Sequence, residues 1–470
     1  MKLWKRPDPI PREALLFSRL DFIKLIIPLF LQQVLNVTVG TVDSMMVAYA
    51  GETAVSGVSL VNSLDTVLVI FFTALIGGGG VVVAQALGSK DDELINNSAK
   101  QLLYVSVAMA TLLTVTVLVL QKPLLSLLFG EVEPAVMQNA GEYFFFVALS
   151  FPLLAINESI GACFRSSGNT LVSLVVSLII NLVNVGGNAL LIIGFEMGAM
   201  GAAISTAFSR LVGAVILLIL IHQKRHPIHI EHLFRYRPNL AMIKRILHVG
   251  VPNGIENCMF QFGRLLTQTL ISTMGTSVIA ANAVALTICN FQYITGTACS
   301  TAMIPIVGRC IGAQEERQAK YYSRVILAVS YAILWAVILF TLIFLNPLVS
   351  AYGLSDASAA LSKQLILYHA LFAAAIWPIG FMLPSAFRAA SDVRFPMVIS
   401  MSSMWIFRVV GGYVMALEQV SVFGFFTFPG FGMGIMGVWI AMTVDWVVRV
   451  AIYATHYVSG RWLRFAKLRA

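Results

Sequence analysis

The chain has 470 residues, of which 58% are hydrophobic and only 11% are charged. Soluble globular domains carry about 25% charged residues, so this composition excludes an ordinary soluble fold. The formal net charge of +9 could by itself suggest nucleic-acid binding. The basic residues, however, gather in the connections between apolar segments, a distribution typical of a membrane protein.

Apolar segments of about 20 residues or more, long enough to cross the hydrocarbon of a bilayer, recur along the whole chain. We predict twelve membrane-spanning helices, six in each half, and therefore an all-α integral membrane protein. The basic N-terminal start leads into a full-length span rather than a short apolar core, which argues against a cleavable signal peptide. The predicted spans lie approximately at residues 25–50, 57–83, 101–121, 138–162, 171–193, 198–222, 248–273, 279–307, 325–350, 363–386, 396–417 and 433–458.

The two halves of the sequence repeat each other about 224 residues apart. Prolines that open apolar segments, glycines that close them and the turn after the second span of each half recur at 224 residues, whereas later motifs recur at 223 and 236 residues. Such a duplication predicts two bundles that can move against each other, as in many transporters that expose one site to alternate sides of a membrane. Pairs with the same separation include Pro28 with Pro252, Gly51 with Gly275, and Gly88 with Gly312.

Basic residues are concentrated in every second connection. If the N-terminus is cytoplasmic, the cytoplasmic connections and both termini hold 25 of the 31 Lys and Arg residues, whereas the opposite connections hold only Lys122 and Lys363. Because an excess of Lys and Arg marks the cytoplasmic side, we predict that both termini are cytoplasmic. Six spans per half then return the chain to its starting side, which makes the halves parallel repeats. The positive charge indicates contact with anionic lipid rather than with DNA.

These patterns predict a chain of five segments. Two six-span lobes are joined by a cytoplasmic linker and flanked by short cytoplasmic ends, the last of them basic. The predicted segments are the N-terminal segment 1–24, the N-lobe 25–222, the linker 223–247, the C-lobe 248–458 and the tail 459–470.

Metal-binding residue types occur in the chain without a convincing pattern. The linker contains His226, His229 and His232, for which an ordinary hydrated loop is favoured over a metal site. The five cysteines lie in or beside the spans without metal-ligand spacing, and we expect them to be reduced, buried thiols. They are Cys163, Cys258, Cys289, Cys299 and Cys310.

Four arginines and five acids within the predicted spans stand out as charges at membrane depth. A charge at membrane depth costs a few kcal/mol, so these side chains should face the protein interior and either pair with each other or serve a site. They are Arg210, Arg264, Arg408, Arg449, Asp43, Asp65, Glu158, Glu256 and Asp445.

The first half contains a coherent polar group. Asn36 and Asp43 share one face of span 1, and span 5 carries three Asn residues at helical spacing. A carboxylate with amide and hydroxyl oxygens suits a dehydrated Na⁺, or a proton held by a carboxylate. The alternative, that the Asn residues only join helices together, stays open at this point. The remaining members of the group are Asn181, Asn184, Asn188 and, in span 6, Thr206.

The second half lacks a counterpart of Asp43, because position 267 is Thr. Span 7 instead carries Glu256, Gln261 and Arg264, and we expect Glu256 to be balanced by Arg264 or by Arg408 of span 11. Asp445 and Arg449 stand four residues apart in span 12, the spacing of an intrahelical ion pair. The first lobe is therefore predicted to bind a cation and the second to be balanced in charge.

Two further acids, Asp65 and Glu158, have no obvious partner in the sequence. Each could line a water-filled substrate path or lie close enough to the membrane surface to be solvated. We regard both as candidates for the substrate cavity, together with Asn36, Asn181, Glu256, Gln261, Arg264, Arg408 and Asp445.

At these residues the chain resembles the multidrug and toxic compound extrusion (MATE) family. The resemblance covers nearly the whole chain, and the order of its motifs on a duplicated twelve-span frame is specific. The motifs are Val42-Asp43, Ala84-Gln85 with Gly88, Phe164-Arg165 with Gly168-Asn169, Asn184, Gly198 with Gly201, Phe387-Arg388 with Asp392, Phe395-Pro396-Met397, and Gly434 with Gly437.

The resemblance implies two six-helix bundles around a V-shaped cavity. In one branch of the family a span 1 Asp, a span 5 Asn and Asp, and a span 6 Thr bind the coupling cation; the matching positions here are Asp43, Asn184, Asn188 and Thr206. Asn188 departs from the Asp of that branch, which lowers the charge of the site. Another branch uses acids of spans 7 and 10. Here Glu256 is a loose match in span 7 and span 10 contains no acid, so we predict no such site.

The resulting hypothesis is a secondary antiporter, not an enzyme. It would export organic cations, drugs or metabolites in exchange for Na⁺ or H⁺, by alternating access of its two bundles, and its cavity should be lined partly by aromatic and Met side chains. We expect no cofactor beyond the coupling ion, a small-molecule partner that is cationic and amphipathic, no nucleic acid, a functional monomer, and a place in the cell membrane.

Two rival functions remain. A flippase or exporter of a lipid-linked or anionic substrate would be favoured if Arg210, Arg264 and Arg408 line the cavity, whereas acids there would favour cationic drugs. A channel or an intramembrane enzyme is disfavoured, because no repeated selectivity filter and no nucleophile–base or metal-ligand spacing stands out.

Overall fold

The computed structural model describes residues 10–11, 15–130, 132–230, 233, 237–422 and 426–466. His232 of the predicted linker and the last four residues of the predicted tail lie outside this part of the chain. Two compact units make up the structure, one running from Phe17 to Gly254 and the other from Ile255 onward with Leu16.

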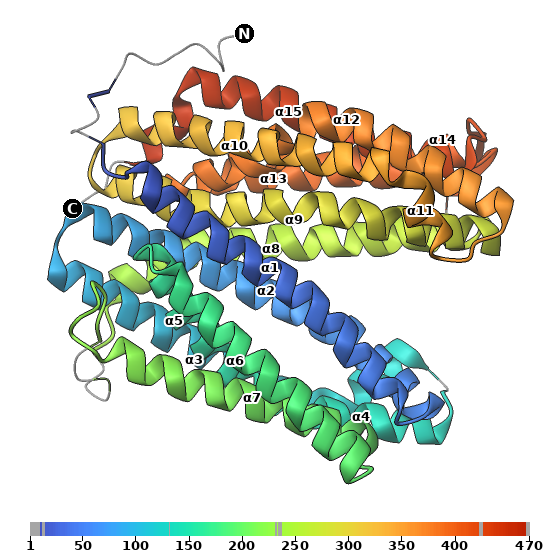
Figure 1. Cartoon of the computed structure of the whole chain (residues 1–470), viewed down its shortest axis with the longest axis horizontal. Coiled ribbons are helices and arrows are strands. Elements are labelled where there is room, and N and C mark those ends of the chain that lie inside the picture. The colour runs from blue at the N-terminus through green and yellow to red at the C-terminus, as the bar shows by residue number, and fades with distance from the viewer. Residues whose placement is uncertain are drawn as a thin grey trace. The chain divides into compact units, whose positions relative to one another are not determined.

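The first unit is a helical bundle in which helices of distant sequence lie side by side, as α1 lies along α6 and α2 along both α4 and α5 (Figure 1). α4 and α5 are bent by 43° where they meet at Ser150. The helices are α1 (Arg19–Ala48), α2 (Glu52–Ser89), α3 (Asp92–Phe129), α4 (Pro134–Leu149), α5 (Phe151–Ser166), α6 (Thr170–Asn188) with a π-helical end (Ala189–Gly194), α7 (Gly198–Ile221), and the first part of α8 (Leu240–Ser272).

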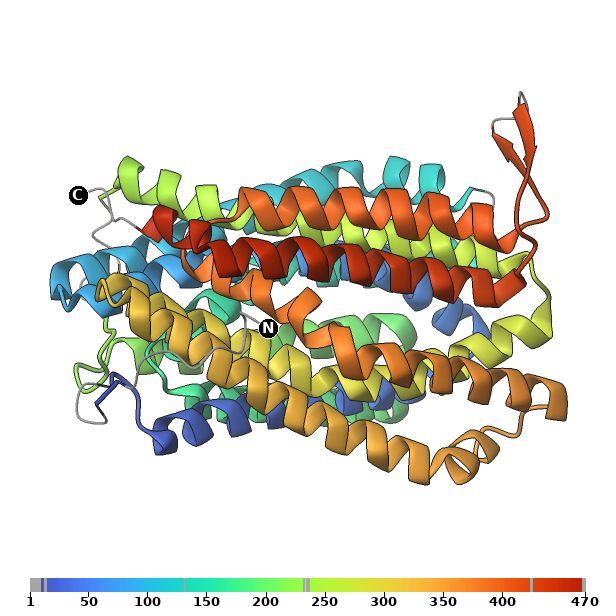
Figure 2. The ribbon, with the colours of Figure 1, turned by 90° about the horizontal axis from the view of Figure 1, so that it is seen from above.

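The second unit is also a helical bundle, in which α12 packs along α9, α10 and α15. Between α14 and α15 the chain forms a hairpin of two short antiparallel strands, which in Figure 2 stands out sideways from the helices near one end of this unit. The elements are the rest of α8, α9 (Thr276–Gly312), α10 (Glu316–Ile343), α11 (Leu345–Ser350), α12 (Asp356–Ala389), α13 (Arg394–Ser403), a π-helical segment (Met404–Val410), α14 (Gly411–Ala416), β1 (Gln419–Val422), β2 (Phe426–Pro429), α15 (Gly434–Ser459) and a final 3₁₀ turn (Arg461–Ala466).

The prediction of an all-α membrane protein is confirmed. Within the described residues ten helical stretches are long and apolar enough to cross a membrane, and the bent pair α4–α5 makes an eleventh. α8 corresponds to the seventh predicted span. It has 33 residues but carries Lys244, Arg245, Glu256 and Arg264, so hydropathy alone does not identify it as a span.

The duplication reappears in the backbone. Gly51 and Gly275 precede α2 and α9 with the same φ of +95°. Lys90 and Gln314, which have the same separation in sequence, have φ values of +57° and +59°. L-residues rarely adopt positive φ, so both halves of the chain place their turns with the same unusual backbone. The predicted repeat therefore extends to individual dihedral angles.

Close helix contact explains part of the glycine content. A Cβ placed on Gly78 of α2 would lie 2.5 Å from the Cα of Gly250 in α8, a distance that no side chain tolerates. Small residues at such crossings let two backbones approach, which is the usual basis of helix association in membranes. This contact ties the beginning of α8 to the first unit, and the two units divide at Gly254 inside a continuous helix.

A buried Asp–His pair fastens the turn between α12 and α13 to α15. His456 Nε2 and Asp392 Oδ2 are 2.7 Å apart, and the His456 ring stacks on Phe395 with centroids 3.8 Å apart. Burial raises the pKa of the Asp392 carboxyl above its ordinary value, and the hydrogen bond from His456 acts in the opposite direction. The surrounding packing and this hydrogen bond together therefore set the protonation of the carboxyl.

Candidate functional site

Asp43 lies at the centre of a polar cluster in the first unit. Asn188 Nδ2 donates a hydrogen bond to Asp43 Oδ1 at 2.9 Å. In the amide orientation that satisfies both of its neighbours, Asn184 Nδ2 donates to Asp43 Oδ1 and Oδ2 at 2.7 and 3.1 Å, and Asn184 Oδ1 accepts from Thr206 Oγ1 at 3.3 Å. The structure therefore brings together the four residues predicted from the resemblance.

The local fold explains how these side chains meet. Asn184 and Asn188 are four residues apart on α6 and share one face. α7 approaches α6 closely, because Gly187 leaves room for Ser205, whose hydroxyl donates to the Asn184 carbonyl at 2.7 Å. The helix widens into its π-helical end directly after Asn188. Such widenings occur often at functional sites.

The cluster opens into a cavity of about 280 Å³ enclosed by α1, α2, α4, α6 and α7. Its lining holds two carboxylates, Asp43 and Asp65, and one guanidinium, Arg210, so the acids outnumber the bases by one. Buried oxygens remain without a hydrogen-bond partner, namely Oδ1 of Asn188 and Oδ1 of Asp65. The lining residues are Gly40, Asp43, Ser44, Val47, Val55, Val58, Ser59, Asn62, Asp65, Tyr143, Val147, Asn188, Ala202, Thr206 and Arg210.

An excess acid together with unsatisfied oxygens is the donor set of a small hard cation. Carboxylate, amide and hydroxyl oxygens suit Na⁺, and a carboxylate without a fixed counter-ion can also hold a proton. No group of three His, Cys, Asp or Glu side chains with metal-binding geometry occurs among the described residues. The oxygen atoms of this cluster are of the type that a small hard cation prefers.

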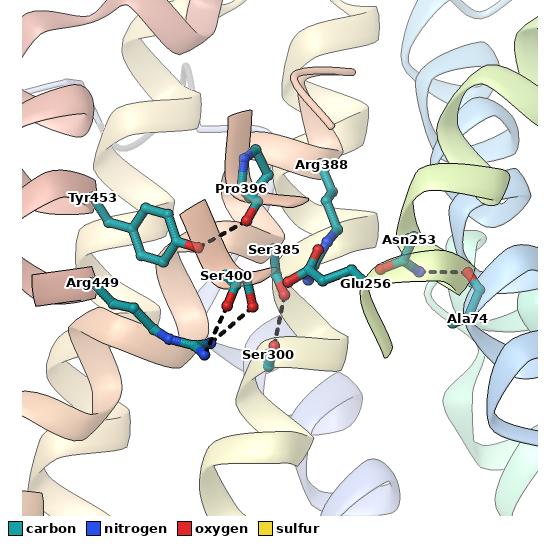
Figure 3. Close-up of polar contacts among 10 residues, drawn as sticks. All are labelled: Ala74, Asn253, Glu256, Ser300, Ser385, Arg388, Pro396, Ser400, Arg449 and Tyr453. Carbon is teal, nitrogen blue, oxygen red and sulfur yellow. Dashed lines mark hydrogen bonds and ion pairs between the residues drawn. The ribbon is translucent and has the colours of Figure 1, made fainter. Parts of the chain in front are cut away.

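The second unit has its own cavity, of about 380 Å³, bounded by α8, α9, α12, α13 and α15. Glu256 and Arg388 point toward each other at its edge (Figure 3), with 2.8 Å between Glu256 Oε2 and Arg388 Nη2. The prediction that Arg264 or Arg408 balances Glu256 is therefore wrong. Arg388 lies near the end of α12, and because the two residues are 132 positions apart, only packing brings them together.

The predicted pair of Asp445 and Arg449 is confirmed. Arg449 Nε donates to Asp445 Oδ1 at 2.7 Å, and both side chains are almost completely buried. Arg449 also donates to the hydroxyl and the carbonyl of Ser400 at 2.8 and 3.0 Å (Figure 3), while Ser403 donates to Asp445 Oδ1 at 2.5 Å. The pair thus joins α15 to α13.

Other predicted site residues lie elsewhere. Asn36 is exposed on α1 and, like Asn181, does not line the first cavity. Arg264 is exposed and donates weakly to Gln261 at 3.3 Å. Glu158 has a partner after all, since Arg165 Nη2 lies 3.4 Å from its Oε2.

Two parts of the sites were missed by the sequence. In the first cavity, Tyr143 of α4 donates to Asn62 of α2 at 3.1 Å, so polar residues of these two helices complete the wall. In the second, Arg388 was visible as part of a turn motif. Its position at the end of a span gave no sign that it reaches inward.

The duplication has a direct counterpart among known proteins. The MatE family profile matches residues 28–190 and again residues 252–414. The two matches begin at Pro28 and Pro252, so their offset is that of the repeat. Together they cover more than half of the chain. The chain belongs to the MatE family.

Relatives with this family's architecture are transporters. The probable multidrug resistance protein NorM of Thermotoga maritima is 25% identical over 473 residues, covering 98% of this chain and 96% of that protein. The uncharacterized transporter YisQ of Bacillus subtilis is 23% identical, with 93% of each chain covered. This chain is accordingly a multi-pass membrane transporter rather than an enzyme.

Solved structures of the family share the fold. A MATE transporter crystallised in a bent conformation matches with a TM-score of 0.82 at 18% identity, over 96% of both chains. An outward-facing multidrug resistance MATE transporter matches with a TM-score of 0.83 at 17% identity, over 95% of this chain and 96% of that chain. At these identities the likeness establishes the twelve-helix MATE fold, whereas the sites must be judged from this chain's own residues.

Proposed function

We propose that this MATE transporter is a secondary antiporter that exports small amphipathic compounds, organic cations among them, in exchange for Na⁺ or H⁺ bound at Asp43. The observation that carries the proposal is the first cavity, where Asp43 receives hydrogen bonds from two amide groups yet has no ionic partner within 4 Å among the described residues. A carboxylate at membrane depth without a counter-ion is costly, so it attracts a cation.

The coupling follows from this charge balance. A cation on Asp43 neutralises the excess acid of the cavity and stabilises the arrangement of the first bundle in which the oxygens converge. After its release the cluster loses that stabilisation, and the arrangement that receives substrate is favoured. An ion shifts such an equilibrium only by its difference in affinity for the two states.

Na⁺ and H⁺ make different demands on the same residues. Na⁺ needs several oxygens at once, and Asn188 Oδ1, Thr206 Oγ1 and the Asp43 carboxylate are the available set. A proton needs only a carboxylate. Because residue 188 is Asn, the cluster carries one negative charge fewer than a pair of Asp residues would. Its electrostatic attraction for Na⁺ is therefore weaker.

The membrane orientation belongs to the same proposal. The concentration of Lys and Arg in alternate connections supports a protein of the cell membrane with both termini in the cytoplasm. We propose further that the transporter works as a monomer.

The test is transport in proteoliposomes under separately imposed Na⁺ and pH gradients. Asp43→Asn should reduce gradient-driven export at least ~10-fold, while the folded protein reconstitutes normally, because the amide keeps the shape and removes the charge. Asp356→Asn is the matched control, since Asp356 is exposed in the first turn of α12. Undiminished export by Asp43→Asn would refute the proposal.

A further inference from the structure

The cavity of the second bundle has the opposite polarity to the first. Its lining carries two guanidinium groups, Arg388 and Arg449, and one carboxylate, Glu256. Arg408 lies just behind the wall, with its guanidinium 5.7 Å from the Phe260 ring, and Asp445 is the only other acid nearby among the described residues. Three bases therefore face two acids in this part of the bundle.

The aromatic walls of this cavity are already used by a cation. The Arg449 guanidinium lies 5.5 Å from the ring centroids of both Phe260 and Phe381. An organic cation would need those negative ring faces for itself. The cavity therefore offers little to a positively charged guest.

Trp377 presents to the cavity a part of its ring that attracts anions rather than cations. Its ring stacks against Tyr293 with centroids 4.9 Å apart and against Phe381 with centroids 5.2 Å apart. Rings of other residues stack on Trp377, and one edge of its ring lies against Gly296, so the part left for a guest is the remaining ring edge. The edge of an aromatic ring carries partial positive charge, which attracts an anion.

Arg388 retains capacity to bind one more acceptor. Its only contact with Glu256 is through Nη2, and its buried Nε has no hydrogen-bond partner among the described residues. A guanidinium commonly binds a carboxylate through two parallel hydrogen bonds, so the pair seen here uses half of that geometry. The Ser300 hydroxyl also lines the cavity and lies 2.6 Å from the Ser385 hydroxyl, so it is a further donor when Ser385 donates to it.

We propose that this cavity binds the acidic group of an aromatic carboxylate, with Arg388 as the principal anion ligand and the ring against Trp377. A volume of about 380 Å³ lies in the range of small-molecule sites. The inference rests on the proposed transport function and extends its substrates to organic anions. Glu256 competes with the ligand for Arg388 and thereby limits its affinity.

The experiment measures binding of 2-naphthoate and of 2-naphthylmethylammonium to the purified full-length transporter by equilibrium dialysis. These probes share one ring system and differ in charge. The wild type should bind the carboxylate at least ~10-fold more tightly than the ammonium compound, which corresponds to about 1.4 kcal/mol. Equal affinities, or tighter binding of the ammonium compound, would overturn the inference.

Two substitutions must act in opposite directions. Arg388→Gln should weaken naphthoate binding ~10-fold or more, whereas Glu256→Gln should strengthen it, because Arg388 loses its competitor. If the cavity were instead a cation site built on Glu256, Arg388→Gln should strengthen binding of the ammonium compound and Glu256→Gln should weaken it. Since Glu256→Gln predicts a gain, misfolding cannot imitate that result.

Controls separate this inference from the coupling site. Arg264→Gln removes one positive charge from exposed surface of α8, outside the cavity lining, and should leave naphthoate binding unchanged. Asp43→Asn should reduce gradient-driven export but keep the preference for the carboxylate over the ammonium compound, because both probes bind to the same arrangement of the protein. If the wild type shows no preference for the carboxylate but export still depends on Asp43, only the anion site is rejected. If the carboxylate preference is present but export does not depend on Asp43, only the coupling proposal is rejected.

Discussion

Neutralising Asp445 should destabilise the second bundle strongly, because Asp445 is the direct counter-ion of a buried arginine. Asp445 is fully buried and Arg449 is 3% exposed, with 2.7 Å between the Asp445 carboxylate and Arg449 Nε. Removing one member of a buried ion pair costs about 3–5 kcal/mol, since the other charge is left in a medium of low dielectric.

The contacts that remain place the expected value near the lower end of that range. In Asp445→Asn the amide oxygen can still accept from Ser403, and Arg449 keeps both hydrogen bonds to Ser400 and its position against Phe260 and Phe381. We therefore expect a loss of about 3 kcal/mol in the free energy of unfolding.

A double-mutant cycle isolates the charge interaction. Asp445→Asn and Arg449→Gln should each cost about 3 kcal/mol or more, whereas the double variant, which removes both members of the pair, should cost about 1–2 kcal/mol. The interaction free energy should then be at least ~2 kcal/mol. Unfolding in mixed dodecyl maltoside and SDS micelles, followed by tryptophan fluorescence, measures all four proteins.

The control is Asp356→Asn, whose carboxylate is exposed in the first turn of α12; a change of no more than about 1 kcal/mol is expected. If the two single variants unfold within about 1 kcal/mol of the wild type, or if the double variant loses the full sum of the single losses, the reasoning from buried charge is refuted.

Two further predictions concern groups that shape the cavities. Gly296→Ala should lower the free energy of unfolding by about 1–3 kcal/mol in the same micelle assay and weaken naphthoate binding, because a Cβ at that position would overlap the Trp377 ring. Unchanged stability and binding would show that the ring can move aside freely. Ser205→Ala should remove the 2.7 Å hydrogen bond to the backbone carbonyl of Asn184 and lower the free energy of unfolding by about 1–3 kcal/mol. It should also lower the apparent affinity for the coupling ion several-fold in proteoliposome transport. An unaltered ion dependence would indicate that Ser205 only joins the helices.

Local sequence determined most of the architecture. Runs of about 20 apolar residues must be helical at membrane depth, because no other backbone satisfies its own hydrogen bonds there. Glycine tolerates positive φ, so Gly51 and Gly275 mark equivalent turns of the repeat in the sequence itself. The Asp445–Arg449 pair was likewise visible, since both residues share one helix.

Tertiary structure decided the partners of residues on different helices. Asp43 and Asn188 are 145 residues apart, and their contact could be expected only because a family resemblance supplied the register between α1 and α6. Nothing supplied the register between Glu256 and Arg388, and the expected partners were wrong.

The duplicated sequence thus specifies twelve spans and their turns through short-range forces. Helix rotation and packing, which depend on contacts between distant segments, decide which charges meet. Because of those contacts the first cavity carries an excess of acid and the second an excess of base. Two bundles built from the same repeat therefore differ in the charge that lines their cavities.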